Sequence, residues 1–299
     1  MTKDDDIVIS VKNLSHRYGK GRLIYENLSF DVQKGRILGL LGKNGTGKTT
    51  TINILMGYLK PLCGECRIFG EDVTRLSPGT RERIALLLEG HVQYSFMTIE
   101  QIEKFYSAFY RKWNRAAYYE LMRKLQVSPG QKIANMSCGQ RSQVALGLIL
   151  AQNADLLVLD DFSLGLDPGY RRLFVDYLRE YAKAENKTVF MTSHIIQDME
   201  RLVDDCIILD YGRILVHKPV KYLTDHFARY VFTASSCAGL ENDARLHSTS
   251  QIRQQCETYS FESETSIRRI LQEHGISFSE LHREAISLED VFIGLTGKY

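Results

Sequence analysis

The chain has 299 residues, of which 44% are hydrophobic and 25% charged, and its 38 basic and 36 acidic side chains leave a formal charge of +2. This length exceeds the usual single hydrophobic core, so we expect a main domain and a smaller appendage. The near-neutral charge provides no strong field for nucleic acid or anionic lipid, and no run approaches the roughly 18 apolar residues of a bilayer span.

The N-terminal part predicts strands. Residues 1–6 are acidic where a secretory signal would be basic, so we expect the chain to stay in the cytosol. Residues 7–37 and 63–73 show short alternating patterns, which predict a small antiparallel sheet beside a parallel core. Cys63 and Cys66 form a lone CxxC that lacks the further ligands of a closed zinc site. We interpret them as incidental thiols, with a redox or soft-metal role as the alternative.

Residues 37–56 contain the most informative pattern. An apolar run at 37–41 predicts a buried strand, residues 42–49 match G-x-x-x-x-G-K-[ST] at every fixed position, and 51–56 continue as a helix with an apolar face. Glycines let backbone N–H groups curl around an anion, and the helix start adds a favourable dipole. A chance match is the alternative, but strand, loop and helix come in the required order.

This pattern predicts a site for a nucleoside triphosphate and Mg²⁺. Lys48 would place its charge between the outer phosphates, and the Thr49 hydroxyl would serve Mg²⁺, which keeps few protein ligands because it gives up water reluctantly. Thr50 is expected to cap the helix or touch phosphate. The residues expected to contact the nucleotide here are Gly42, Asn44, Gly45, Thr46, Gly47, Lys48, Thr49 and Thr50.

Residues 98–150 predict a helical subdomain rich in aromatic side chains. Its first helix is expected to carry apolar residues on one face, at positions 102, 105, 106, 109, 110 and 113. Nine of the chain's thirty aromatic residues fall between Tyr94 and Tyr119, well above an even spread. Two interpretations stay open: an ordinary subdomain core, and a docking surface with Tyr94 and Phe96 at its exposed rim.

Two further strand-like runs end in polar side chains. The apolar run 156–159 is typical of a parallel strand covered on both faces, and it ends in Asp160 and Asp161. Strand-end carboxylates meet ligands in such sheets, so Asp160 is expected to hold Mg²⁺ through water and Asp161 to orient an attacking water. A solvated acidic turn is the alternative. Residues 189–192 predict a second parallel strand before His194, which alone would be interpreted as structural.

The C-terminal part predicts a hairpin and then a small α+β domain. Residues 204–220 read as two strands joined at a glycine turn, and the main domain is expected to end near Thr224. The elements expected beyond it are strands at 229–235 and 257–261, a helix at 264–273 and a final capped helix over 287–292. The predicted domains are therefore 1–224 and 225–299.

Five signals in this order resemble the ATP-binding-cassette (ABC) family over roughly residues 7–220. They are the phosphate loop, Ser137-Cys138-Gly139-Gln140, the strand ending in Asp160-Asp161, Gly165-Leu166-Asp167, and Thr192-Ser193-His194. The resemblance implies an α/β P-loop fold with a mixed, mostly parallel core sheet, an antiparallel β-subdomain and a helical subdomain. The segment S-L-E-D-V-F at 287–292 resembles part of the small C-terminal domain of ABC-2-type exporter ATPases.

The resemblance also implies roles for particular residues. Tyr18 would stack on adenine, with a plain surface tyrosine as the alternative. In the family, two such domains clamp two ATP molecules head to tail. Ser137, Gly139 and Gln140 would then contact the γ-phosphate bound by the opposite subunit. Asp167 would reach across the same interface.

The catalytic centre of the family implies one further role and reveals three departures. His194 would hydrogen-bond the γ-phosphate and help to fix the attacking water. Cys138 replaces a glycine, which would be strained if the backbone there needs φ > 0. Glu89 stands where the family has a glutamine beside Mg²⁺, so it is a candidate for the metal and for catalysis. Asp161 replaces the catalytic glutamate, and since a misplacement of about 1 Å costs on the order of 10²-fold in rate, we expect slow hydrolysis that Asp161 still supports.

The resemblance implies the ATP-hydrolysing subunit of an ABC exporter. It would use ATP and Mg²⁺, pair with a second copy or a related ATPase subunit, and drive a separate transmembrane permease from the cytoplasmic face of the membrane. The aromatic cluster lies where the resembled transporters receive a cytoplasmic helix of that permease. No nucleic-acid partner is expected. Two alternatives stay open: a slow or inactive ATP-gated sensor, and a soluble ABC ATPase outside transport.

Overall fold

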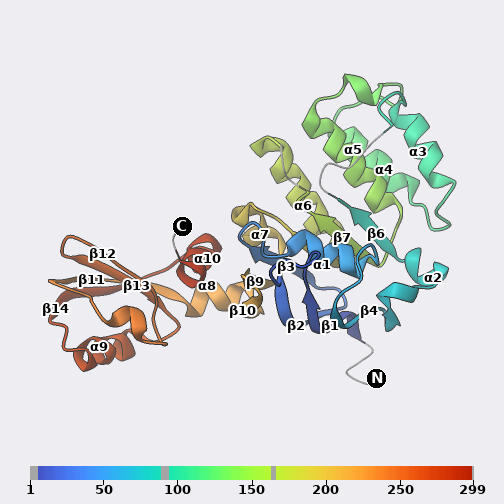
Figure 1. Ribbon diagram of the computed structural model, residues 1–299. Helices are drawn as coiled ribbons and strands as arrows, with labels where there is room; N and C mark the ends of the chain where they lie inside the picture. The colour runs from blue at the N-terminus through green and yellow to red at the C-terminus, as the bar shows by residue number, and fades with distance from the viewer. Residues whose placement is uncertain (1–5, 89–93, 163–165, 298–299) are drawn as a thin grey trace. The chain divides into compact units, whose positions relative to one another are not determined.

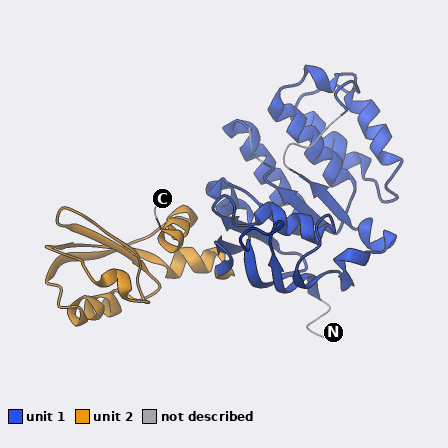
Figure 2. Cartoon of the chain, in the orientation of Figure 1, with its two compact units in different colours: residues 1–214 blue, residues 215–299 orange. Residues whose placement is uncertain are grey.

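The computed structural model describes residues 6–88, 94–162 and 166–297. The chain forms two compact units, residues 1–214 and 215–299 (Figure 2). Helix α8 (Val220–His226), which spans the boundary near Thr224 expected from the sequence, lies in the second unit. Within the described ranges, no helix is both long enough and apolar enough to cross a bilayer.

A six-stranded sheet has the order β10-β9-β3-β8-β7-β6, and its strands from β9 to β6 form the centre of the first unit, which ends within β10 (Figure 1). Its strands are β3 (Ile37–Gly42), β6 (Ile84–Leu87), β7 (Leu156–Asp160), β8 (Thr188–Thr192), β9 (Asp205–Asp210) and β10 (Arg213–Pro219). From β9 to β6 the neighbours pair in parallel. Every residue of β7 and β8 is buried, as continuous apolar runs in a parallel sheet require. The predicted α/β fold is confirmed.

An antiparallel sheet with the order β2-β1-β4-β5 lies against this core. It consists of β1 (Ile7–His16), β2 (Tyr25–Gln33), β4 (Cys63–Ile68) and β5 (Glu71–Asp72), and the short helices η2 (Val73–Arg75) and α2 (Pro78–Arg81) follow it. The Phe30 ring of β2 stacks on Phe190 of β8 with 5.8 Å between ring centroids. The two sheets therefore share one hydrophobic core, and the predicted β-subdomain is confirmed.

Helices complete the first unit. They are α1 (Lys48–Leu55), α3 (Ile99–Ser107), α4 (Arg115–Lys124), η3 (Ile133–Asn135), α5 (Cys138–Ala151), α6 (Pro168–Ala184) and α7 (Ile196–Leu202). The buried Tyr118 of α4 donates its hydroxyl to the Ile99 carbonyl of α3 at 3.0 Å, which fixes these helices together. Helix α3 ends at Ser107, so the aromatic pattern continues beyond the end of the helix that it predicted. Trp113 lies beyond α3 and donates to the buried carboxylate of Glu103 at 2.8 Å.

The second unit is an α+β structure built on a four-stranded antiparallel sheet with the order β12-β13-β11-β14. Its elements, besides α8, are β11 (Ala228–Ala234), η4 (Leu240–Asn242), β12 (His247–Ile252), β13 (Gln255–Ser260), α9 (Glu264–Glu273), β14 (Phe278–Glu284) and α10 (Leu288–Thr296). Ile267, Ile270 and Leu271 of α9 pack into the core of this sheet. Helix α10 starts with a reciprocal capping box between Ser287 and Asp290, as the sequence predicted for a capped helix here.

Candidate functional site

The phosphate loop lies between β3 and α1, and its backbone depends on glycine. Gly45 and Gly47 adopt φ values of +80° and +98°, where other residues are strained. A Cβ on Gly47 would come within 2.5 Å of the Ile24 side chain and 2.6 Å of the Tyr25 ring. Thr46 is buried and donates its hydroxyl to the Lys43 carbonyl at 2.8 Å. The loop conformation therefore admits no larger residue at 47.

Lys48 is buried at the start of α1, and its ammonium lies inside the curl of the loop. Its Nζ donates to the Gly42 carbonyl at 2.7 Å and to the Lys43 carbonyl at 3.2 Å. Burial lowers the pKa of Lys48, although the nearby carboxylates of Asp161 and Asp160 act in the opposite direction. The loop thus holds the Lys48 cation against two backbone carbonyl groups, and the role of Lys48 in phosphate binding stays a prediction.

Asp160 and Thr49 provide the oxygens expected of a magnesium site. The Thr49 hydroxyl donates to Asp160 Oδ1 at 3.3 Å, and Asp160 is only 2% exposed. A hydroxyl and a carboxylate suit Mg²⁺, which retains water and takes few protein ligands. The described part of the chain gathers no group of three or more His, Cys, Asp or Glu side chains suited to a metal. Glu89, the other metal candidate, lies outside the described residues.

Asp161 and His194 form a close pair beside this site. Asp161 Oδ2 lies 2.5 Å from His194 Nε2, and Asp161 Oδ1 accepts from the His194 backbone N–H at 3.3 Å. Asp161 is 4% exposed, whereas the His194 side chain is 41% exposed. Asp161 has φ +48°, in the left-handed region that aspartate tolerates better than most residues. This turn after β7 directs the carboxylate toward His194.

Tyr18 lies beside the phosphate-loop helix. Its hydroxyl shares a hydrogen bond of 3.2 Å with the Thr50 hydroxyl, and its ring meets the buried His16 ring edge-on at 5.1 Å. Tyr18 is 53% exposed, so one end of the side chain is fixed while the ring stays accessible. This position is compatible with stacking on a base held by the loop.

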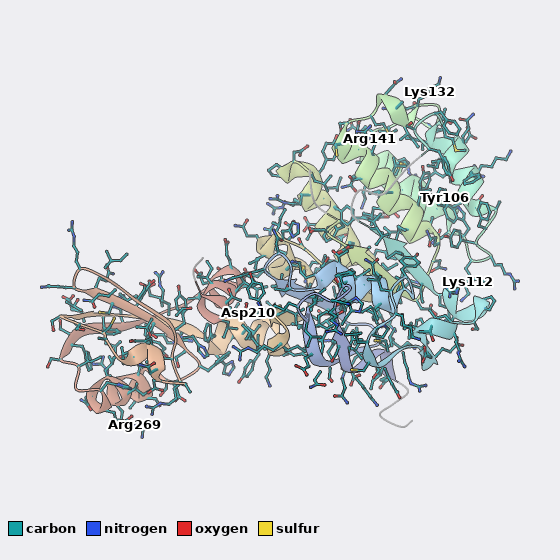
Figure 3. The ribbon with its side chains drawn as sticks, viewed as in Figure 1. Tyr106, Lys112, Lys132, Arg141, Asp210 and Arg269 are labelled. Carbon is teal, nitrogen blue, oxygen red and sulfur yellow. The ribbon has the colours of Figure 1, made fainter. Side chains whose placement is uncertain are left out.

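The segment 137–140 lies apart from the phosphate loop of the same chain. Ser137 caps α5 through a reciprocal capping box with Gln140. Figure 3 labels Arg141, in the first turn of α5, within the helical region, well away from α1 in Figure 1. Cys138 is the first residue of α5 and has no positive φ, so the strain considered for this glycine replacement does not arise.

The start of α5, at Gly139, packs against the start of α6, which Asp167 caps. A Cβ on Gly139 would come within 2.6 Å of the Tyr170 ring of α6. The buried Gln143 of α5 donates to the Tyr170 carbonyl at 2.9 Å. Asp167 caps α6, its Oδ1 accepting from the backbone N–H groups of Gly169 and Tyr170 at 3.1 Å each. The two helix starts are therefore held together and expose Ser137 and Asp167.

The structure thus separates the predicted site residues into two groups. The phosphate loop, Tyr18, Asp160, Asp161 and His194 gather around the ends of β3, β7 and β8, whereas Ser137, Gly139, Gln140 and Asp167 form the second group. Sequence reasoning named Thr192 only as part of a motif and gave it no role in the site, although its hydroxyl donates to Asp160 Oδ1 at 2.6 Å. The parallel register that pairs Asp160 with Thr192 is the signal that points to it.

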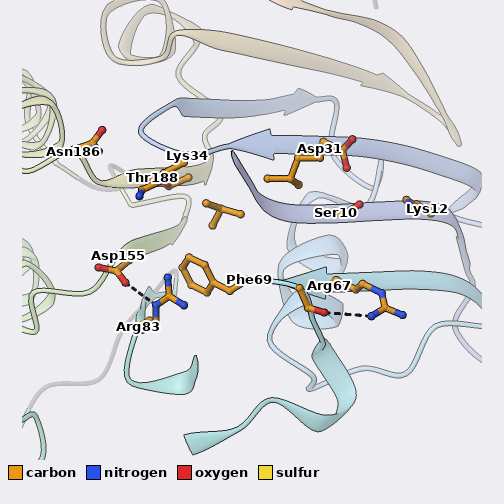
Figure 4. A pocket seen from close by; sticks show the side chains of 13 residues that line it. Ser10, Lys12, Asp31, Lys34, Arg67, Phe69, Arg83, Asp155, Asn186 and Thr188 are labelled. Atoms are coloured by element: carbon orange, nitrogen blue, oxygen red, sulfur yellow. Dashed lines mark hydrogen bonds and ion pairs between the residues drawn. The ribbon is translucent and has the colours of Figure 1, made fainter. Parts of the chain in front are cut away.

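A cavity of about 620 Å³ lies at the opposite ends of these strands (Figure 4). Arg83 pairs there with Asp155 at 2.7 Å, and its guanidinium lies 3.6 Å from the centre of the Phe69 ring. None of the site residues predicted from the sequence lines this cavity. It is therefore separate from the phosphate loop.

Comparisons with known proteins agree with this geometry. The family described as ABC transporter matches residues 25–163. The bacitracin transport ATP-binding protein BcrA of Bacillus licheniformis is 28% identical, with 97% of each chain covered. The Nod factor export ATP-binding protein I of Burkholderia orbicola is 30% identical, again with 97% of each chain covered.

Solved structures show the same fold over 71–73% of the chain. The ATP-binding subunit of an ABC transporter shares 26% identity at a TM-score of 0.64, covering 73% of this chain and 92% of that one. A dimeric ATP-binding cassette in a post-hydrolysis state with ADP and Pi shares 21% identity at a TM-score of 0.61, covering 71% and 98%. The chain belongs to the ATP-binding proteins of the ABC transporter family and is an ABC ATPase.

Proposed function

We propose that this ATPase is the Mg²⁺-dependent motor subunit of an ABC exporter and that it acts on a separate transmembrane permease. The observation that carries the proposal is the grouping of Lys48, the Thr49–Asp160 pair and the Asp161–His194 pair at one edge of the parallel sheet. The relatives named for bacitracin transport and Nod factor export, matched over 97% of their length, support export as the direction.

Hydrolysis in this site would depend on positioning and charge rather than on covalent chemistry. Lys48 and the loop N–H groups bind the outer phosphates. Mg²⁺, held by Thr49 and through water by Asp160, would neutralise charge that develops on them. Asp161 would accept a hydrogen bond from the attacking water, and His194, whose side chain is partly exposed, would orient Asp161 and hydrogen-bond the γ-phosphate.

A second copy of the chain, or a related ATPase subunit, would complete the site. The exposed positions of Ser137 and Asp167 support this, because a head-to-tail pair would bring the α5 and α6 starts of one protomer to the nucleotide of the other. The dimeric cassette of the same fold is consistent with such a pair. ATP-dependent dimerisation of the full chain, measured by light scattering, tests this arrangement. A protein that hydrolyses ATP only as a monomer would contradict it.

The permease would dock on an exposed aromatic patch, which we define as Tyr94, Phe96, Phe105 and Phe109. These side chains are 43%, 70%, 37% and 64% exposed, and neighbouring rings lie 5.2–6.0 Å apart. Contiguous exposed apolar surface of this kind marks interaction sites. Its aromatic, uncharged character suits an apolar helix on the cytoplasmic side of the permease, which would also hold the chain at the membrane.

The proposal is tested with the chain and its permease in membranes. The double variant Phe96→Ser/Phe109→Ser should keep its basal hydrolysis and lose most stimulation by the permease. The matched variant Tyr211→Ser, which alters an exposed aromatic residue outside the patch, should keep both. Equal stimulation of the patch variant and the wild type would refute the docking site. If the permease does not stimulate ATP hydrolysis by the wild type, the motor function is refuted.

One observation favours a second candidate, an ATP-gated sensor with little turnover. Asp161 is shorter than the glutamate of the resembled family and is bound by both the ring and the backbone N–H of His194. A carboxylate held in this way would orient water less effectively. Steady-state phosphate release with and without permease separates the two: stimulation supports the motor, and persistently bound ATP supports the sensor.

A further inference from the structure

Thr192 joins the two acidic residues at the end of β7. It is the last residue of β8, is 0% exposed, and pairs with Asp160 in the parallel register. Its hydroxyl donates to Asp160 Oδ1 at 2.6 Å and accepts from the Asp161 backbone N–H at 3.2 Å. The buried Thr192 hydroxyl therefore contacts two consecutive residues of the site, Asp160 and Asp161.

The contact with Asp160 determines which of its two carboxylate oxygens accepts hydrogen bonds from the protein. Thr192 and Thr49 both donate to Oδ1, and Oδ2 has no hydrogen bond among the described residues. A hydrogen bond of 2.6 Å to a carboxylate is of the strong, charge-assisted kind, and burial strengthens it further. Rotation of the carboxylate would break this bond, so Thr192 holds both oxygens of Asp160 in one orientation.

The contact with Asp161 supports an unusual backbone turn. The Asp161 N–H lies 3.2 Å from both the hydroxyl and the carbonyl oxygen of Thr192, and the residue has φ +48°. A non-glycine residue in this region needs support from its surroundings. With this turn in place, Asp161 Oδ2 lies 2.5 Å from His194 Nε2.

We infer that Thr192 is a positioning residue of the metal–nucleotide site, whose hydroxyl sets the orientation of Asp160 toward Mg²⁺ and holds the turn that brings Asp161 to His194. The inference rests on the proposed function because it requires Mg²⁺ at the Thr49–Asp160 pair. Residues that orient metal ligands in this way typically contribute ~10- to 100-fold in metal affinity.

The same strand offers a matched control. Thr188 begins β8, is 1% exposed, and its hydroxyl accepts from the Gly35 backbone N–H at 3.0 Å. Thr188 and Thr192 are thus two buried threonines at opposite ends of one strand. Removal of either hydroxyl leaves a backbone N–H with one acceptor fewer, buried at Asp161 and partly buried at Gly35. Only the change at Thr192 affects Asp160.

The test measures Mn²⁺ affinity by electron paramagnetic resonance on the full chain with a non-hydrolysable ATP analogue. Thr192→Val should weaken Mn²⁺ binding by ~10-fold or more, because the hydroxyl that orients Asp160 is lost. Thr192→Ser, which restores the hydroxyl, and Thr188→Val should stay within ~3-fold of wild type on the same grounds. Binding of the analogue without metal should be the same in all four proteins.

Wild-type Mn²⁺ affinity in Thr192→Val would overturn the inference, as would equal losses in Thr192→Ser and Thr192→Val. If Thr192→Val does not fold, Thr192→Ala serves as the hydroxyl-free variant and is judged by the same comparison. Absence of Mn²⁺ binding to the wild type with nucleotide would instead refute the proposed Mg²⁺-dependent function. The two failures are therefore distinguishable.

Discussion

Replacement of Asp161 by asparagine isolates the contribution of its charge. Asparagine has nearly the same size and also tolerates the left-handed φ of +48° found here. Its Oδ1 can still accept from the His194 backbone N–H, which lies 3.3 Å away. The variant loses the negative charge and the second acceptor, which faces His194 Nε2 at 2.5 Å. We therefore expect Asp161→Asn to fold and to bind ATP.

We expect Asp161→Asn to hydrolyse ATP more slowly than the wild type. A positioned general base contributes ~10²- to 10⁴-fold in rate. Since each tenfold corresponds to ~1.4 kcal/mol, the barrier should rise by ~3–5 kcal/mol. Phosphate release under saturating ATP measures the loss, and thermal unfolding together with binding of a fluorescent ATP analogue verifies that fold and affinity are kept.

Asp155→Asn provides the matched control for this experiment. Asp155 precedes the same strand at its opposite end and pairs with Arg83 at 2.7 Å, away from the phosphate loop. The same chemical change there should leave phosphate release unchanged, because both partners are about 42% exposed and such pairs contribute little to stability. Equal hydrolysis by Asp161→Asn and wild type would remove Asp161 from the mechanism and refute the assignment of the base.

Three further changes follow from the same geometry. Gly47→Ala should abolish ATP binding in a titration, because its Cβ would meet the Ile24 side chain at 2.5 Å with φ at +98°; unchanged affinity would contradict the loop geometry. Gly139→Ala should retain ATP binding but lower turnover, since its Cβ would displace the Tyr170 ring at a cost of ~1–3 kcal/mol; wild-type turnover would contradict this. Burial lowers the pKa of His16 below its ordinary value of 6.5, so the side chain is protonated more easily in the unfolded chain than in the folded one. The free energy of unfolding should therefore fall as the pH drops through 6.5 toward the pKa of the folded state. His16→Phe should reduce this pH dependence, measured by thermal unfolding.

The sequence predicted the elements that depend on local pattern. The apolar runs of β3, β7 and β8 are continuous because these strands are buried on both faces, and glycines at 45 and 47 are required by positive φ. These signals are local, so the phosphate loop and the acidic strand end could be located without a structure. The strands β12 and β14 were missed, because their sequences are largely polar and only part of each is buried.

Other features depend on tertiary contacts that no local pattern contains. The aromatic run after residue 102 predicted one continuous helix, but α3 ends at Ser107. Trp113 is instead held by its hydrogen bond to Glu103. The positive φ that would have strained Cys138 does not occur, because Ser137 caps α5 and leaves Cys138 as an ordinary first-turn residue. Gly165 and Glu89 lie outside the described residues, so their expected roles stay predictions.

The turn at Asp161 gives a physical reason why aspartate is compatible with a position where the resembled family has glutamate. A left-handed φ favours a short side chain that can bond to local backbone, and aspartate meets this requirement better than glutamate. The backbone turn brings the shorter carboxylate to His194. Because Thr192 also bonds to the Asp161 N–H, Asp160, Asp161 and His194 belong to one hydrogen-bonded unit. Catalytic consequences of the shorter side chain therefore depend on this unit as a whole.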